Sequence, residues 1–118
     1  MSTPMLQPQE VLGLFELDET GRVLYSSMEG EDGSLARERN IKGLHFFSQV
    51  VAFANAEELR RRFEIFKCES ITASSFDFIC HYANTAVPVR VLLARLREQE
   101  SLLLHLRKNS NGSNSSIA

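Results

Sequence analysis

The sequence predicts an α+β fold in which an antiparallel sheet carries helices on one face. A hairpin pattern over residues 12–27 comes first, a helical block over 35–68 follows, and the last third of the chain alternates apolar and polar residues with the period of a strand. Strands grouped on both sides of a block of helices are typical of α+β domains. The helices must share one face of the sheet to bury its apolar side.

Residues 12–27 are predicted to form a β-hairpin. The segment 12–18 alternates loosely, and 22–27 is rich in residues that favour strands. Between them, the run from Asp18 to Gly21 is typical of a tight turn with glycine in its last position. Residues 1–10, which include Pro4 and Pro8, are expected to be an extended lead-in.

The middle of the chain is predicted to be helical. Leu35–Ile41 is expected to form a short helix that Gly43 ends as a C-cap. Leu44–Ala54 is expected to form a buried helix, because its apolar face is wide. Asn55 is expected to cap a third helix, with Glu58 completing a capping box. The apolar face of that helix has the spacing i, i+4, i+7 and consists of Leu59, Phe63 and Phe66.

From Ile71 the apolar period changes from 3.6 to 2, which predicts three strands in a meander. With the hairpin they make a five-stranded sheet. A polar turn is expected over 97–100, and the Asn- and Ser-rich residues 109–118 are expected to be a disordered tail, so the domain spans 11–108. The side chains expected to face the helices are Phe76, Phe78, Cys80, Val89, Val91, Leu102, Leu104 and Leu106.

Composition excludes several classes of protein. The 118 residues make one ordinary domain, and a net charge of −2 argues against a nucleic-acid binder. No apolar run approaches the roughly 18 residues that a membrane span needs, and no secretory signal begins the chain. Cys68 and Cys80 have neither the spacing of a metal site nor that of a disulfide framework. We therefore expect a reduced, cytoplasmic protein.

The order of elements resembles that of a PAS domain. Asp18-x-x-Gly21-x-Val23 is similar to the first hairpin of that family, and Gly43-x-x-Phe46-Phe47 to its central helix. Within the family the chain looks most like photoactive yellow protein and its relatives, from about Gly13 to Lys108. The resemblance implies a five-stranded antiparallel sheet with helices over one face. It also implies a small cavity between them, and a role in sensing or protein interaction. The motifs that carry it most clearly are Phe76-Asp77-Phe78 through Tyr82, Val89-Arg90-Val91 and Ser101.

The chain departs from photoactive yellow protein at the chromophore. The register of the cysteine that bonds the coumaroyl group holds Phe53, and the tyrosine and glutamate that hold its phenolate fall near Ser26 and Gly30. A thioester needs a sulfur nucleophile, which Phe53 cannot supply. We therefore expect no p-coumaric acid chromophore. The frequent asparagine of the second strand is replaced by Ser27, and the helix cysteine of flavin-binding relatives is absent.

Two interpretations of the apolar interior stay open. Phenylalanines could line a ligand cavity, with His45 as a haem ligand, or they could simply be the core. Cys80 could have a redox or covalent role there, or could be a small buried hydrophobe. His81 and His105 should point to the outer face of the sheet. The candidate cavity residues are His45, Phe46, Phe53, Phe63, Phe78 and Cys80.

The outer face of the sheet is the more informative feature. If the alternation holds, it carries Ile79, Leu92 and Leu103 from three neighbouring strands, joined by Leu12 or Leu14 of the first strand. A solvated face should be polar at such positions, so an apolar stripe predicts a covering partner. Met5 and Leu6 are candidates to cover part of it. We expect a homodimer, or docking of a signalling protein, through this face.

Three functions compete. The chain is expected to be a PAS sensory and interaction module in bacterial signalling that acts by binding. The alternatives are a sensor that binds haem or a small apolar metabolite, and a small α+β enzyme. No Ser-His-Asp set, phosphate loop or HExxH motif points to an enzyme.

Overall fold

The computed structural model describes residues 6, 11–29, 35–38, 41–96 and 101–109. The predicted lead-in, the loop over 30–34, the turn over 97–100 and the tail lie outside these residues. The exceptions are Leu6 of the lead-in and Asn109, the first residue of the tail. The elements in chain order are β1 (Gly13–Leu17), β2 (Val23–Glu29), β3 (Leu35–Glu38), the short helix η2 (Phe46–Val50), α1 (Ala56–Cys68), β4 (Ala73–His81), β5 (Ala86–Leu96) and β6 (Ser101–Lys108).

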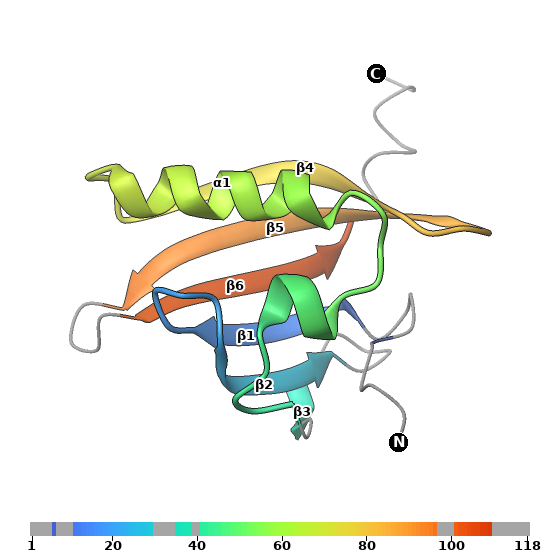
Figure 1. The fold of residues 1–118 in the computed structure, drawn as a ribbon, viewed down its shortest axis with the longest axis horizontal. Coiled ribbons are helices and arrows are strands. Elements are labelled where there is room, and N and C mark those ends of the chain that lie inside the picture. The colour runs from blue at the N-terminus through green and yellow to red at the C-terminus, as the bar shows by residue number, and fades with distance from the viewer. Residues whose placement is uncertain (1–5, 7–10, 30–34, 39–40, 97–100, 110–118) are drawn as a thin grey trace.

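The strands form one antiparallel sheet in the order β3-β2-β1-β6-β5-β4. Both helices pack on the same face of it, α1 over β4 and β5 and η2 over β1 and β2 (Figure 1). The two ends of the strand order, β3 and β4, are the edges of the described sheet. The predicted architecture of an antiparallel sheet with helices on one face is confirmed.

The first hairpin forms as predicted, and Asp18 organises its turn. Its carboxylate accepts hydrogen bonds from the amides of Thr20 (2.9 Å) and Arg22 (3.0 Å) and from the Thr20 hydroxyl (2.6 Å). Gly21 donates to the Asp18 carbonyl at φ +99°, a conformation that glycine adopts freely. Partial burial alone would raise the pKa of Asp18, but these hydrogen bonds outweigh it and lower the pKa.

The predicted helix over Leu35–Ile41 is wrong. Leu35–Glu38 forms β3, a sixth strand that pairs with the far side of β2. Its residues favour helix, but so short a segment cannot sustain a helix alone, and the open side of β2 offers it hydrogen-bond partners. Gly43 is therefore no C-cap. At φ +90° it turns the chain after Ile41, and its amide donates to the Val23 carbonyl (2.7 Å).

The predicted helix over Leu44–Ala54 is too long. Only Phe46–Val50 is helical, as one wide turn in which the Val51 amide donates to the Phe46 carbonyl (3.1 Å). Val51 is extended, and the Ala54 amide donates to the carbonyl of His81 on β4 (2.7 Å). The chain must cross here from the β2 side of the sheet to the β4 side. An extended residue covers about twice the distance of a helical one, so the crossing favours extended backbone.

The predicted capping box of α1 is also wrong. Asn55 precedes the helix, but its side chain makes no capping hydrogen bond. Its amide Nδ2 donates to the Ile79 carbonyl (2.8 Å), and its Oδ1 accepts from the His81 amide (3.1 Å). Asn55 thus pairs with the edge of β4 as a short strand would. The predicted buried face of α1 is confirmed, since Leu59, Phe63 and Phe66 are all at most 2% exposed.

The core fills the space between the helices and the sheet. The inward alternation of the last three strands is as predicted, with Phe78, Cys80, Val89 and Val91 buried. Leu6 is a correction, because it does not cover the outer face. It is buried in the core, and its amide donates to the carbonyl of Val50 in η2 (2.9 Å). The N-terminal segment therefore meets the helical side of the sheet at this residue.

Candidate functional site

The predicted cavity residues other than His45 lie in the interior, packed on other aromatic rings. Phe46 contacts Phe15 of β1 edge-on, with ring centroids 4.8 Å apart. Phe63 of α1 contacts Phe47 at 5.2 Å. A continuous aromatic row therefore joins β1, η2 and α1, since Phe46 and Phe47 are themselves 5.1 Å apart. Burial of these rings stabilises the contact between both helices and the sheet.

The position of the expected chromophore cysteine lies in a second aromatic group. Phe53 contacts Phe78 (6.0 Å) and Tyr82 (5.9 Å) edge-on. Cys80 lies on the same inward face of β4 and is fully buried. Burial raises the pKa of its thiol to about 12, so the sulfur is neutral at ordinary pH. Burial also raises the pKa of Tyr82 to about 12, with a smaller contribution from Cys80.

His45 lies at the end of the aromatic row, against the turn between β1 and β2. A Cβ added to Gly21 would come within 3.2 Å of its Nε2, so Gly21 leaves room for the imidazole. The ring contacts Phe47 at 6.2 Å, and Nδ1 is buried without a hydrogen-bond partner. His45 also lines a pocket of about 350 Å³ with Phe47, Ser48, Ala54, Ala56, Glu57 and Arg60.

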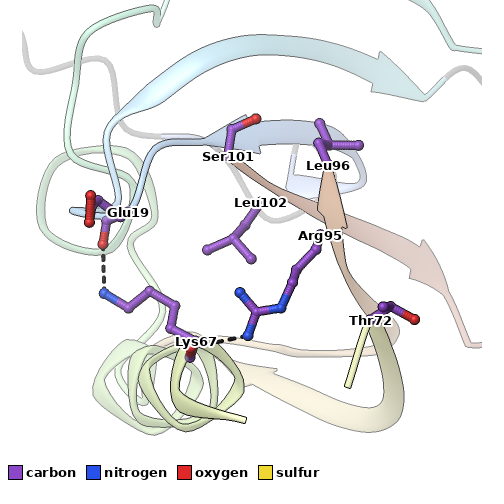
Figure 2. Close-up of a pocket in the computed structure, with 7 residues that line it drawn as sticks. All are labelled: Glu19, Lys67, Thr72, Arg95, Leu96, Ser101 and Leu102. Carbon is purple, nitrogen blue, oxygen red and sulfur yellow. Dashed lines mark hydrogen bonds between the residues drawn. The ribbon is translucent and has the colours of Figure 1, made fainter. Parts of the chain in front are cut away.

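The largest of the three pockets described here opens where α1 ends (Figure 2). It has a volume of about 550 Å³. Lys67 of α1 and Arg95 of β5 line it together with Leu102 (Figure 2). The Lys67 ammonium donates to the Glu19 carbonyl (2.6 Å) and pairs with Glu64 (2.8 Å). This lysine therefore ties α1 to the turn of the first hairpin.

Arg95 holds the C-terminal end of α1. Its Nη2 donates to the carbonyls of Phe66 (2.9 Å) and Lys67 (3.0 Å) and to that of Glu69, and its Nε donates to Ile71 (3.2 Å). Carbonyls at the end of a helix lack partners within it and carry partial negative charge, so a guanidinium suits them. The charge of Arg95 is thus matched by the helix end.

The predicted site residues do not include Arg95, although the alternation on β5 contains a signal for it. Val89, Val91 and Leu93 face inward, and the next inward position is Arg95. An arginine on the buried face of a strand needs partners. The pattern could have marked this residue as an anchor for a neighbouring element, but not which element.

The outer face of the sheet brings three of the four predicted interface residues together. In the register of the strands, Leu14 of β1 lies opposite His105 of β6, and His105 opposite Leu92 of β5. Residues that lie opposite one another across the strands form a row. The next row on the same face, two residues along each strand, places Leu103 of β6 beside Ala94 of β5. Side chains in adjacent rows of one face contact one another across the strands. Leu14, Leu92 and Leu103 therefore form one cluster, hereafter the outer-face cluster.

Ile79 is on the same face but does not belong to this cluster. It lies opposite Pro88, two rows from Leu92. The row between them holds the ion pair of Asp77 and Arg90 (2.8 Å). Ile79 is 47% exposed near the β4–β5 turn. The expectation that it continues the apolar stripe is wrong, because the alternation gives the face of a residue but not its row.

No three His, Cys, Asp or Glu side chains among the residues that the structure describes lie where they could hold a metal ion. No helix in this part of the chain is long and apolar enough to cross a membrane.

Comparison with known proteins identifies the fold. No family model and no curated protein matches the chain. Among solved structures, the chain is similar to the photoactive yellow protein domain of the sensor histidine kinase Ppr from Rhodospirillum centenum. The TM-score is 0.62 at 17% sequence identity, over 85% of this chain and 95% of that domain. The PAS fold expected from the sequence is confirmed.

Proposed function

We propose that the chain is a sensory and protein-interaction module of the PAS type in bacterial signal transduction, and that it acts by binding and dimerisation rather than by catalysis. The outer-face cluster carries this proposal. Leu14, Leu92 and Leu103 lie together on the sheet face opposite to both described helices. The fold neighbour supports the signalling role, because it is a domain of a sensor histidine kinase.

The chemistry of the outer-face cluster favours association. Leu14, Leu92 and Leu103 are already partly buried, so contact with a partner would add only part of the about 1.5–3 kcal/mol that full burial of a leucine-sized side chain contributes. The three contributions together would still favour a complex. Aliphatic side chains of adjacent strands also make a flat surface that a second copy of the same sheet can match. We therefore favour a homodimer through this face, with a separate signalling protein as the other occupant.

A single layer of sheet separates the interior from this face. On β5, Val91 and Leu93 are buried against the helices, and Leu92 between them points outward. A shift of β5 caused by a change among the inner side chains would therefore move Leu92. The proposed mechanism is that a change at the helices or the core alters the outer contact through such a shift.

The oligomeric state tests the proposal. Leu92→Asp and Leu103→Asp should shift a dimer to monomer in sedimentation velocity, with at least about tenfold weaker association, because a charge would have to be buried. Ile65→Asp is the matched control, because Ile65 is 52% exposed on α1 and lies away from the cluster. A chain that stays monomeric at millimolar concentration and binds no partner through this face would contradict the proposal.

A cofactor- or metabolite-binding sensor is the second candidate, with haem on His45 or an apolar ligand among the phenylalanines. The unpartnered Nδ1 of His45 supports it. The position of Nε2 against Gly21 and the mutual packing of Phe46, Phe53, Phe63 and Phe78 favour the first proposal. An absorbance spectrum of freshly purified protein separates them. A Soret band that His45→Ala abolishes would establish the second.

We further propose that the module works in the cytoplasm without a coumaroyl chromophore. Cys68 and Cys80 are both free, which suits a reducing compartment. The position expected to carry the pigment is Phe53, and it packs against Phe78 and Tyr82.

A further inference from the structure

The edge strand β4 exposes part of its backbone. In an antiparallel pair, alternate residues point their N–H and C=O groups toward the partner strand and away from it. Asn55 bonds the Ile79 carbonyl and the His81 amide from outside the sheet, so these two residues point away from β5. By alternation, Asp77, Ser75 and Ala73 point away as well. The Arg95 amide of β5 donates to the Thr72 carbonyl, so Thr72 points toward β5, as the alternation requires.

Nothing within the described residues pairs with this outward backbone. Ala54 and Asn55 cover the edge at Ile79 and His81 only. The edge from Ala73 to Asp77, hereafter the open edge, therefore presents three N–H and three C=O groups that no described residue pairs with. Natural edges are often protected by a bulge, a proline or a lysine. β4 pairs with β5 through nine residues without a bulge, and its sequence contains neither proline nor lysine.

A groove between α1 and β4 meets the open edge at Asp77. It has a volume of about 310 Å³ and is lined by Asn55, Glu58, Arg62, Asp77, Phe78, Ile79 and His81. The Arg62 guanidinium lies over the ring of Phe76, 4.3 Å from its centroid. In the part of the chain that the structure describes, Arg62 makes no ion pair, whereas Asp77 is already paired with Arg90 (2.8 Å). The groove thus contains one cation with unused donors.

We propose that the open edge binds an extended segment of a partner protein as a further strand. The partner's backbone would pair with Ala73, Ser75 and Asp77. Its residue opposite Phe76 would carry a carboxylate, because side chains of directly opposed residues share a face and Arg62 lies over Phe76 on that face. Strand addition to a free sheet edge is a general way of recognising peptides.

The length of the open edge favours a peptide over a second copy of the chain. Five residues offer far less contact than the roughly 800 Å² per partner of a stable protein interface. Such an edge suits a short segment that binds weakly and reversibly. The site is separate from the outer-face cluster, so either proposal can fail without the other.

The test uses the full chain and the acetylated, amidated peptide Thr-Val-Glu-Val-Thr-Val as the probe, which in antiparallel pairing places its Glu opposite Phe76 and its valines opposite Asp77, Ser75 and Ala73. In a titration followed by ¹⁵N NMR, the amides of Ala73, Ser75 and Asp77 should shift and exchange more slowly with solvent. Ser75→Pro should weaken binding at least about tenfold, because it removes an outward donor and its ring obstructs the added strand. It leaves the bonds to β5 intact, since the Ser75 amide points away from β5. Ser75→Ala keeps the amide and should bind like the parent chain.

The carboxylate is tested separately. Replacing the peptide's Glu by Gln should weaken binding by about threefold to tenfold, and in Arg62→Gln the two peptides should bind equally. Equal binding by Ser75→Pro and Ser75→Ala would overturn the proposal, as would the absence of binding. Shifts centred on Leu92 and Leu103 would also overturn it. If the chain forms a dimer that Ser75→Pro dissociates and Ser75→Ala does not, the open edge binds a second copy of the chain and not a peptide, and the proposal is overturned.

Discussion

At the scale of single residues, burial decides what the chemically versatile side chains can do. Cys80 of β4 and Tyr82, which directly follows that strand, are both turned toward the core, and the pKa of each is raised to about 12. A neutral, fully buried thiol behaves as a small apolar side chain. Cys68 has the same chemistry but is exposed at the end of α1. The sequence alone could not separate these two cysteines, because their difference is one of solvent access.

The native chain should therefore react at one thiol only. With an aromatic disulfide reagent at pH 8, we expect Cys68 to react quickly and Cys80 to react only after unfolding. Cys68→Ser should abolish the fast phase, and Cys80→Ala should leave it unchanged. Fast labelling of Cys80 in the folded Cys68→Ser variant would show that solvent reaches the core.

The same burial predicts how stability depends on alkaline pH. The Cys80 thiol ionises near 9.0 in the unfolded chain and near 12 in the folded one, so between these values only the folded state keeps the proton. Stability should fall as pH rises from about 9 toward 12, by up to about 1.4 kcal/mol per pH unit from this group. Urea denaturation from pH 8 to 11 measures it. Cys80→Ala should show a shallower decline, and an equal decline would refute the assignment.

At the scale of elements, side chains from distant segments fasten the helices to the sheet. Asn55 joins the start of α1 to Ile79 and His81 of β4, and Arg95 joins its end to β5. Lys67 adds a bond to the first hairpin. Both ends of α1 are thus held by groups 24 or more residues away in the sequence, so neither anchor follows from local helix signals.

Asn55 can be tested as a strand anchor against its predicted role as a helix cap. Asp and Asn cap helices about equally well, so a capping residue should tolerate Asn55→Asp. An anchor should not, because Asp loses the donor to the Ile79 carbonyl and brings a carboxylate toward it. We expect Asn55→Asp to lower the free energy of unfolding by about 1–2 kcal/mol at pH 7. If the parent chain and the Asn55→Asp variant are equally stable in urea, Asn55 acts as a helix cap and not as a strand anchor.

Arg95 should matter more than an ordinary surface arginine. Arg95→Met keeps much of the packing on Phe66 but leaves several helix-end carbonyls without their donor. We expect a loss of about 1.5–3 kcal/mol in the free energy of unfolding, as for hydrogen bonds to a charged group. Arg60→Met is the matched control, because Arg60 only forms an exposed pair with Glu57 on α1 and should change stability by less than about 0.5 kcal/mol.

At the scale of the whole molecule, the aromatic interior decides between a filled core and a ligand cavity. Phe63 is 1% exposed and connects α1 to the aromatic row through Phe47. The proposal of a module that acts through its surface rests on such rings filling the space between helices and sheet. Removing one of them should create a cavity that the parent chain lacks.

Phe63→Ala tests this filling. The free energy of unfolding should fall by about 3–5 kcal/mol, as for other large-to-small changes in a core. Benzene should raise the melting temperature of the variant and leave that of the parent chain unchanged, because apolar cavities of this kind bind small apolar molecules. Phe63→Leu, with a smaller loss, provides a folded comparison if the alanine variant is too unstable. Stabilisation of the parent chain by benzene would favour the ligand-binding alternative.

The sequence by itself determined the first hairpin, the inward and outward faces of the last three strands, and the buried face of α1. Each is a periodic or turn signal read within a few consecutive residues, and burial enforces it because a shift by one residue would expose the core. The order of these elements is the one that resembles a PAS domain.

Only the tertiary structure decided the rest. Residues 35–38 became a strand because β2 offered a free side, and the helix at Phe46 stopped early because the chain had to cross the sheet. The side chain of Asn55 bonds the edge of β4 instead of capping α1. Ile79 lies outside the outer-face cluster because it is two rows away from Leu92. Each outcome depends on a partner or a distance that lies far away in the sequence, and local patterns carry no information about either.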